Sequence, residues 1–276
     1  LINQNMDYWS LMDAGEYTYN GYRPTEYTAW ERERFGWMDI ETLSEASNIE
    51  LAPLSEGGKA YRIVNDKDQS GHEYYILENV QKKGWNKSAF GSGMMVTHVD
   101  YDDYYFSLGG CKVNSTAGHP RMTIMPADGM FVSEYYIGET IKESSDPTVK
   151  EINAPLVEKY GGQEFTSALY KAEAAGDLYP GTANTTSLTD TSSPVKAWTY
   201  TGETMDKPIT DIAMNPETGI VSFKFMGGKT DGIRNISTDG ATVEPIYSIS
   251  GIHMNHDFNS LPKGIYIIGG KKMVKE

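Results

Sequence analysis

A succession of short strand-like runs, separated by glycine, asparagine and aspartate, constrains this chain more than any other feature. From about residue 45 the runs cover residues 60–64, 73–80, 94–99, 121–125 and 219–226. In the last run Val221 and Phe223 alternate with polar Ser222 and Lys224, which is the period-two pattern of a half-buried antiparallel strand. Several such strands with few helices between them predict a mainly β fold with some α, and its central part is expected to be an antiparallel β-sandwich.

One helix is expected ahead of these runs, at residues 24–36. Pro24 suits the first turn of a helix, and Gly36 can end it in a left-handed conformation. On such a helix Glu31 and Arg34 lie three residues apart on one side, among aromatic side chains. We predict that they form a structural ion pair; the alternative is that Glu31 is a catalytic carboxylate.

Shifts in composition predict three parts in the chain. Their boundaries are expected at residues 1–45, 46–228 and 229–276. Within the middle part, residues 141–176 interrupt the β pattern as an insertion, and residues 166–175 predict a short helix ended by Gly176. The last part begins with a polar, glycine-containing linker. It continues with two candidate strands, residues 245–250 and 264–269, which predict a small β tail unit outside the main core.

Charge and cysteine content exclude several classes of protein. The 276 residues contain 24 Lys and Arg against 38 Asp and Glu, a net charge of −14. Such a chain repels nucleic acid and anionic lipid, so no nucleic-acid partner is expected. No run of about 18 apolar residues is present, and no transmembrane helix is predicted. Cys111 is the single cysteine, which excludes an internal disulfide and a structural zinc finger.

The five residues from His72 to Ile76 begin like a zinc-peptidase signature, in which two histidines at i and i+4 on a helix bind zinc and a glutamate activates water. The fifth residue is Ile76, so the second histidine is missing. The tyrosines that follow Glu73 favour a strand, on which residues i and i+4 are too far apart to share a metal. We therefore do not assign zinc to His72.

An acidic segment follows the predicted strand at 94–99. On that strand His98 and Asp100 project to the same face, and Asp102 and Asp103 continue into a loop. Clustered carboxylates are the hard oxygen ligands that calcium prefers. We predict a calcium site at Asp100, Asp102 and Asp103; the alternative is a solvated acidic loop beside a histidine that is satisfied within the fold.

Chemical motifs alone complete no active site, but a resemblance extends the interpretation. Residues 7–15, 20–32 and 35–37 closely resemble the immune inhibitor A-like family of secreted zinc metallopeptidases. The run from Trp9 to Met12 matches the family's Met-turn, a tight loop whose methionine forms an apolar floor under the zinc. The resemblance continues through runs near residues 73–79, 84–86, 93–100, 119–129 and 177–181, and covers roughly residues 7–228.

This resemblance implies the C-terminal lobe of a zincin catalytic domain and hydrolysis of peptide bonds in proteins. In the family the zinc ligands and the general base lie on a helix ahead of the matching segment, so they are expected upstream of Leu1. No catalytic or zinc-binding residue is therefore assigned in this chain, which is expected to be inactive alone.

The resemblance also directs attention to the aromatic residues around the Met-turn. Trp9, Tyr17 and Tyr19 are the candidates for contact with a protein or peptide substrate. Tyrosine hydroxyls can support a developing oxyanion, and tryptophan packs against side chains. These three residues are therefore predicted to border the substrate cleft.

The tail, residues 246–251 and 261–272, is similar to carboxy-terminal modules of secreted Bacteroidetes proteins that are associated with sorting to the cell surface. It implies export machinery as a partner and a secreted or cell-surface location. A different reading of the tyrosine- and tryptophan-rich strands is a non-enzymatic surface module that binds glycans or proteins. Coplanar exposed rings on one sheet face would favour that module, whereas an unfinished cleft around Met12 would favour the peptidase.

Overall fold

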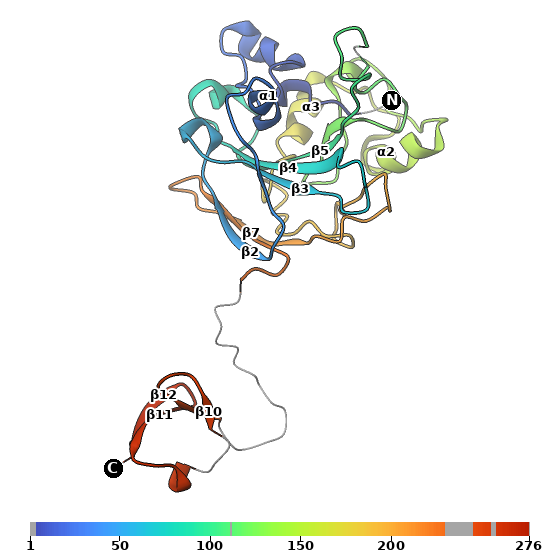
Figure 1. The fold of residues 1–276 in the computed structure, drawn as a ribbon. Coiled ribbons are helices and arrows are strands. Elements are labelled where there is room, and N and C mark those ends of the chain that lie inside the picture. Colours follow the sequence, from blue (N-terminus) through green and yellow to red (C-terminus); the bar gives the residue numbers. More distant parts are fainter. Residues whose placement is uncertain (1–3, 111, 230–244, 255–257, 276) are drawn as a thin grey trace. The chain divides into compact units, whose positions relative to one another are not determined.

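The computed structural model describes residues 4–110, 112–229, 245–254 and 258–275 (Figure 1). Leu1 and Cys111 lie outside the described residues. The chain divides into two compact units, residues 1–229 and residues 230–276. The fold is mainly β with few helices, as the sequence predicts.

The first unit contains eight strands among its described residues. They are β1 Glu41–Thr42, β2 Ser47–Leu51, β3 Tyr61–Val64, β4 Glu73–Val80, β5 Gly93–Asp100, β6 Met122–Ile124, β7 Ile209–Met214 and β8 Val221–Phe225. The five strands predicted from the sequence correspond to β3, β4, β5, β6 and β8 and are confirmed. The sequence did not predict β1, β2 and β7.

Two sheets form from these strands. The larger has the order β1-β3-β4-β5-β6, with β1 parallel to β3 and the other pairs antiparallel. The smaller is antiparallel with the order β2-β8-β7. Figure 1 shows β2 and β7 on one side of the layer formed by β3, β4 and β5.

Strand β4 is buried along its whole length, because both of its faces carry apolar residues. Tyr75 and Leu77 point to one side and share a hydrophobic cluster with Val221, Phe223 and Phe225 of the smaller sheet. The alternate residues Tyr74, Ile76 and Val80 belong to a second cluster, which includes Met6, Trp9 and Ala29 from the amino-terminal segment. The larger sheet is therefore covered on both faces.

Helix α1 spans Ala29–Arg34, so the sequence-based start at Pro24 was wrong. Thr28 is the N-cap: its hydroxyl accepts from the Glu31 amide, and the Glu31 carboxylate accepts from the Thr28 amide. This capping box fixes the start of the helix and outweighs the preference of proline for a first turn. At the other end Gly36 is left-handed, with φ +71°, as the sequence predicts.

The insertion carries the other two α-helices, α2 Pro147–Tyr160 and α3 Ser167–Ala174. Asp146 caps α2, and Thr166 caps α3. The predicted short helix is α3, whereas α2 was not predicted. Side chains of this region form a cluster of their own that includes Val132, Leu156, Phe165 and Tyr170.

Five single-turn or distorted 3-10 segments complete the first unit. They cover Asp7–Trp9, Ala14–Gly21, Leu54–Glu56, Gly84–Ser88 and Glu134–Tyr136. None of the helices in the described parts of the chain has the length and apolar character needed to cross a bilayer.

The described residues of the second unit form a four-stranded antiparallel sheet with the order β10-β9-β11-β12. Its strands are β9 Ile246–Ser248, β10 His253–Met254, β11 Gly264–Ile268 and β12 Lys271–Lys275, and a further 3-10 turn covers Phe258–Ser260. Ile246, Leu261 and Tyr266 form its small core. The two predicted strands, β9 and β11, are confirmed, and β10 and β12 were not predicted.

Candidate functional site: the Met12 loop and two adjoining cavities

The loop that carries Met12 begins at a strained residue. Asp7 is buried and has φ +46°, which is unusual for a residue with a side chain. Its carboxylate accepts from the Ser133 hydroxyl at 3.0 Å and from the Glu134 amide at 2.8 Å. Its own amide donates to Oδ2 of Asp13 at 2.7 Å. These bonds hold the left-handed conformation and tie the two ends of the loop together.

The turn inside the loop depends on a close approach between Ser10 and Gly15. The amides of Asp13 and Gly15 both donate to the Ser10 carbonyl, at 3.2 and 2.9 Å. A Cβ atom on Gly15 would lie 2.4 Å from that carbonyl oxygen, so only glycine fits. The chain therefore makes a tight turn between Ser10 and Gly15. Its assignment as the family's Met-turn stays a prediction.

Glu31 anchors this turn to helix α1. Its Oε1 accepts from the Ser10 hydroxyl at 2.5 Å and from the Met12 amide at 3.1 Å, while its Oε2 accepts from the Thr28 amide at 2.7 Å. The predicted ion pair between Glu31 and Arg34 was wrong. The buried carboxylate instead obtains three hydrogen bonds from residues that surround it, which compensates its charge without a cation.

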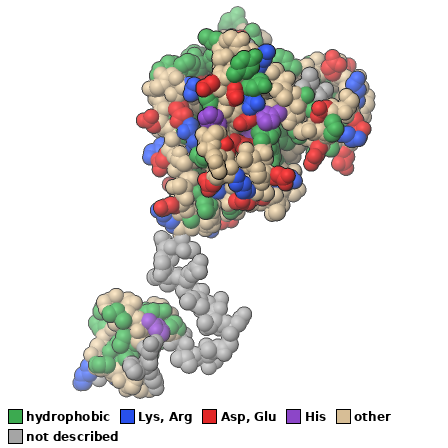
Figure 2. All heavy atoms as spheres, turned by 45° about the vertical axis from the view of Figure 1, so that its right-hand side comes forward, with side chains coloured by type: hydrophobic (Ala, Val, Ile, Leu, Met, Phe, Trp, Pro, Cys, Tyr) green, Lys and Arg blue, Asp and Glu red, His purple; other side chains and the backbone are tan. Residues whose placement is uncertain are grey.

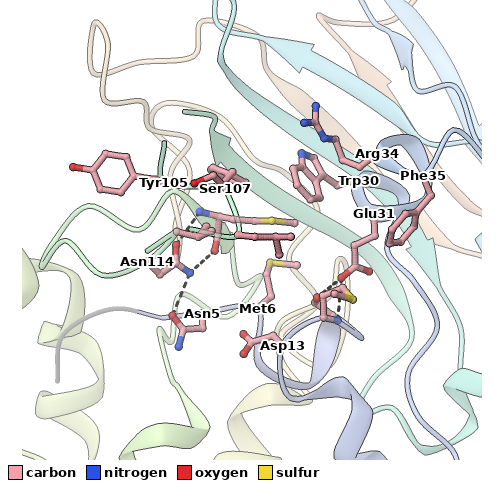
Figure 3. A pocket seen from close by; sticks show the side chains of 16 residues that line it. Asn5, Met6, Asp13, Trp30, Glu31, Arg34, Phe35, Tyr105, Ser107 and Asn114 are labelled. Atoms are coloured by element: carbon pink, nitrogen blue, oxygen red, sulfur yellow. Dashed lines mark hydrogen bonds between the residues drawn. The ribbon is translucent and has the colours of Figure 1, made fainter. Parts of the chain in front are cut away.

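The Met12 side chain is 68% exposed, although its backbone is held firmly. It lies at the edge of a cavity of about 510 Å³, which we call the Met12 pocket. Its apolar lining comes from Met6, Trp30, Phe106, Leu108, Val113 and Met122. Figure 3 shows Asn114 beside this lining, bonded to Asn5 at 3.2 Å and to the Met122 carbonyl at 2.7 Å. The Met12 loop and α1 thus border an open, largely apolar hollow.

Buried acids lie behind the Met12 loop. Burial raises the pKa of Asp7 to about 7, against the lowering effect of its bonds from Glu134 and Ser133. Asp177 is also buried; burial and, after it, the nearby charge of Asp128 raise its pKa well above the ordinary value. Asp177 accepts from Nε1 of Trp9 at 2.7 Å. Trp9 itself is 3% exposed, so the structure places it in the core and not on a cleft surface, which corrects its predicted contact with substrate.

Tyr17 and Tyr19 are exposed, at 64% and 61%, in the distorted segment Ala14–Gly21. Tyr19 is left-handed with φ +53°, and the guanidinium of Arg23 lies 5.0 Å from its ring centroid. Neither tyrosine is among the residues that line the Met12 pocket. The structure thus leaves both free for contact with another molecule but does not bring them to the pocket wall.

The three aspartates of the calcium prediction each have a partner in the protein. Oδ2 of Asp100 accepts from Arg121 at 2.6 Å and lies 2.7 Å from Nε2 of His119. Asp102 accepts from the amides of two following residues, and Asp103 accepts from the Tyr101 hydroxyl at 2.7 Å. The calcium site remains a prediction. In the structure these three carboxylates form hydrogen bonds with neighbouring protein groups.

Glu73, from the incomplete zinc-peptidase signature, points into the core. Its Oε1 lies 2.9 Å from Nε2 of His98, which is fully buried. Glu73 also accepts from the amides of Tyr200 and Thr201 and from the side chain of Asn65. Its pKa is lowered because these bonds, that of His98 foremost, outweigh the opposing effect of burial. Glu73 is therefore a structural anchor between the larger sheet and the segment near residue 200.

A second cavity of about 540 Å³ adjoins the first, and we call it the Arg62 groove. Arg34 lines both cavities. The groove is otherwise polar and aromatic, lined by Glu33, Thr42, Arg62, His72, Tyr74 and Tyr101. The sequence did not reveal this groove, because its residues come from five separate segments that no local motif connects.

Zinc does not fit the residues described here. In the parts of the chain with assigned positions, no three histidine, cysteine, aspartate or glutamate side chains are grouped as metal ligands. A protein zinc site needs about three such ligands. We therefore derive no hydrolytic step from this chain's own side chains. The expectation that the zinc ligands and the general base lie upstream of Leu1 stays a prediction.

Comparisons of the chain with protein-family models, with curated proteins and with solved structures gave no match.

Proposed function

We propose that this chain forms the floor and one wall of the cleft in a secreted zinc endopeptidase. Under this proposal residues 1–45 belong to the C-terminal lobe of a zincin catalytic domain and contribute β1 to the larger sheet, and residues 46–228, which supply the other strands of both sheets, form a β-sandwich behind that lobe. The support is the resemblance of residues 7–37 to the immune inhibitor A-like family, together with the geometry of the Met12 loop.

The observation that carries the proposal is the contrast between the fixed backbone and the exposed side chain of Met12. Hydrogen bonds from the Ser10 hydroxyl and the Met12 amide to Glu31 hold the loop, yet the methionine is 68% exposed at the rim of an apolar hollow. Leu108 and Phe35, which also line the hollow, are exposed to 97% and 46%. Large apolar side chains gathered around one cavity mark a surface that another element covers. A zinc-bearing segment is the element that the resemblance implies.

In the proposed enzyme the zinc and its general base come from a segment that precedes the Met-turn in the family. When bound, zinc would activate a water molecule for attack on the scissile carbonyl. In that enzyme the Met12 loop of this chain would pack against the zinc-bearing segment, and α1 and the Arg62 groove would border the path of the substrate. The second unit is proposed to carry the protein to export machinery and the cell surface.

The rival, a glycan-binding or protein-binding module, calls for a flat row of exposed rings on a sheet. Among the described residues none of the large exposed aromatic side chains lies in a strand; they lie in 3-10 segments, turns and loops, namely Tyr17, Tyr19, Tyr22, Phe35, Trp37, Trp85, Tyr104 and Tyr135. Phe35 and Trp37 are the closest pair of these with a measured geometry, and their planes are inclined by 36°. The geometry therefore favours the peptidase over a sheet-face binding module.

The test compares the 276-residue chain with a version extended at its amino end by the upstream coding sequence. We expect bound zinc near one per chain and hydrolysis of casein in the extended protein only. In that protein Met12→Ala should reduce zinc retention or turnover by about tenfold, whereas the exposed Met273→Ala serves as the control. An extended protein that has neither zinc nor activity would overturn the proposal, and so would peptidase activity in the 276-residue chain that depends on His72.

A further inference from the structure

We propose that the Arg62 groove binds an acidic side chain of a peptide, with Arg34 and Arg62 as the groups that hold its carboxylate. The inference rests on the proposed function, because it names the substrate class that the same cleft would select. Its physical basis is a local positive charge in a protein whose net charge is −14.

Arg34 is the first part of this basis. Its Nη2 donates to the Tyr101 hydroxyl at 2.9 Å, and its guanidinium lies 4.9 Å from the ring centroid of Tyr101 and 5.6 Å from that of Trp30. These rings hold the guanidinium in place. Within the described residues Arg34 forms no ion pair, whereas Arg32, Arg62 and Arg121 each pair with a carboxylate. Its charge is therefore available to an anion from outside.

Arg62 provides the second cation. Its guanidinium lies 4.6 Å from the centroid of the Tyr74 ring, and its Nη2 contacts Oε2 of Glu33 at 2.5 Å. The Nε atom is buried and out of reach of a ligand, and Nη2 is engaged by Glu33. Nη1 is the remaining Arg62 donor, and the described residues provide no acceptor for it. Nη1 can therefore donate to a carboxylate in the groove, in a side chain that is already fixed.

The charges around the groove favour one anionic group and not a polyanion. Arg34 and Arg62 are offset only in part by Glu33, and the exposed His72 stands edge-on to Tyr101 with 5.8 Å between ring centroids. Acidic side chains are spread over the visible face of the first unit (Figure 2). A nucleic acid or an anionic membrane would meet that repulsion along its length. A single glutamate or aspartate between neutral residues of a peptide would contact the arginines of the groove and would bring no further negative charge near the acidic surface.

The position of Arg34 relates the groove to the proposed cleft. Arg34 lines both cavities, and in Figure 3 its guanidinium points away from Met6 and Asn5 on the Met12 side. A peptide that crosses the Met12 pocket would therefore pass the groove beside Arg34. The preferred substrate has an acidic side chain on that side of the Met12 pocket.

Binding can be measured on the 276-residue chain without zinc. The probe is a fluorescein-labelled octapeptide of alanines with one leucine and, three positions on, one glutamate, acetylated and amidated at its ends. The paired probe has glutamine in place of glutamate. By fluorescence anisotropy we expect the glutamate peptide to bind about tenfold more tightly, with the difference declining as salt is added.

Arg34→Gln and Arg62→Gln should each remove most of that tenfold preference without weakening the glutamine peptide. Arg34→Lys should keep part of it. Lys150→Gln, on the exposed face of α2, changes the net charge equally and is the matched control; thermal melting checks that every variant is folded. Equal binding of the two peptides, or a preference unchanged in both arginine variants, would overturn the inference. Competition by inorganic phosphate but not by acetate would overturn the carboxylate as its ligand.

This experiment separates the inference from the proposed function. If the extended protein lacks zinc and activity while the glutamate preference persists, the groove binds acidic peptides outside a peptidase. If the extended protein cleaves casein and the preference is absent, the peptidase stands and the groove does not select its substrates.

Discussion

Oε1 of Glu31 accepts a hydrogen bond from the hydroxyl of Ser10 at 2.5 Å, and this contact joins helix α1 to the loop of Met12. The same carboxylate also caps α1 through the Thr28 amide. One buried side chain therefore sets both the start of a helix and the path of a loop that lies 21 residues away in the sequence.

Glu31→Ala should consequently destabilise the first unit strongly. It leaves the Ser10 hydroxyl and the amides of Met12 and Thr28 without their acceptor, which is expected to lower the free energy of unfolding by about 2–4 kcal/mol. Urea denaturation followed by tryptophan fluorescence measures this loss. Glu151→Ala, on the exposed surface of α2, is the control. A loss for Glu31→Ala no larger than that of the control would show that the network does not stabilise the fold.

Stability should fall as the pH rises from about 5 to about 8. Burial raises the pKa of Asp7 to about 7 and that of Glu78, despite its bond from the Ala29 amide, to about 8. Between their ordinary values and these raised values, the folded state holds more protons than the unfolded state. The contribution of these groups is therefore greatest at low pH and is lost as the pH rises through the window. Urea midpoints measured across this range check the sign, and midpoints that rise with pH would contradict it.

Asp7→Asn should flatten that pH dependence and stabilise the protein at about pH 8 by roughly 2 kcal/mol. Asparagine tolerates the left-handed backbone of this position. Its carbonyl can accept from the Glu134 amide, and its amide group can donate to the Ser133 hydroxyl, which is able to accept as well as donate. The measurement is the urea midpoint of variant and parent at about pH 5.5 and about pH 8. If the urea midpoint of the variant depended on pH as strongly as that of the parent, the pH dependence would come from Glu78 or Asp177 and not from Asp7.

Phe225→Ala tests the cluster that the two sheets share. Phe225 is fully buried at the end of β8, and truncation should cost about 3–5 kcal/mol. Ser222→Ala, exposed on the same strand, should change stability by less than about 0.5 kcal/mol. Chemical denaturation of both variants makes the comparison. A small effect of Phe225→Ala would mean that the smaller sheet is not coupled to the larger one in the folding transition.

Deletion of residues 230–276 should leave the unfolding of the first unit cooperative, because that unit contains its own clusters and both of its sheets. Circular dichroism melts of the shortened and full chains are the measurement. A shortened chain that melts gradually, or not at all, would show that the first unit depends on the tail.

The calcium prediction for Asp100, Asp102 and Asp103 has a direct test. If the site exists, millimolar calcium should raise the melting temperature by mass action, and Asp102→Asn should abolish the increase. An unchanged melting temperature would remove the prediction and leave Asp100 to its contacts with Arg121 and His119.

The strands with a clear hydrophobic pattern could be predicted from the sequence. The strands whose pattern is interrupted, and which form because of tertiary contacts, could not. Strands β4 and β5 were predicted because each contains a run of aromatic, β-branched or other apolar residues, residues 74–77 in β4 and residues 94–96 in β5. In β7, Asp211 is left-handed with φ +54° and the register shifts between Thr210 and Ala213, which breaks the alternation that reveals a strand.

The candidate site was predictable only where its residues are neighbours in the chain. Residues 7–15 are neighbours in the chain, and the structure has a tight turn between Ser10 and Gly15, whose assignment as a Met-turn stays a prediction. The partner of Glu31 is Ser10 and not the nearby Arg34, a choice made by packing across 21 residues. The Arg62 groove combines Arg34, Arg62, His72 and Tyr101, and no spacing rule connects side chains that only the sheet brings together.

The burial of β4 on both faces also determines where this protein can tolerate substitutions and insertions. Each of its eight residues serves one of two cores or a buried polar contact, so a randomised library over Glu73–Val80 would yield almost no folded members. The turn immediately after it is different, because residues 82–85 are exposed. An epitope tag or a fluorescent label inserted there would sit beside the most constrained strand of the molecule without disturbing it.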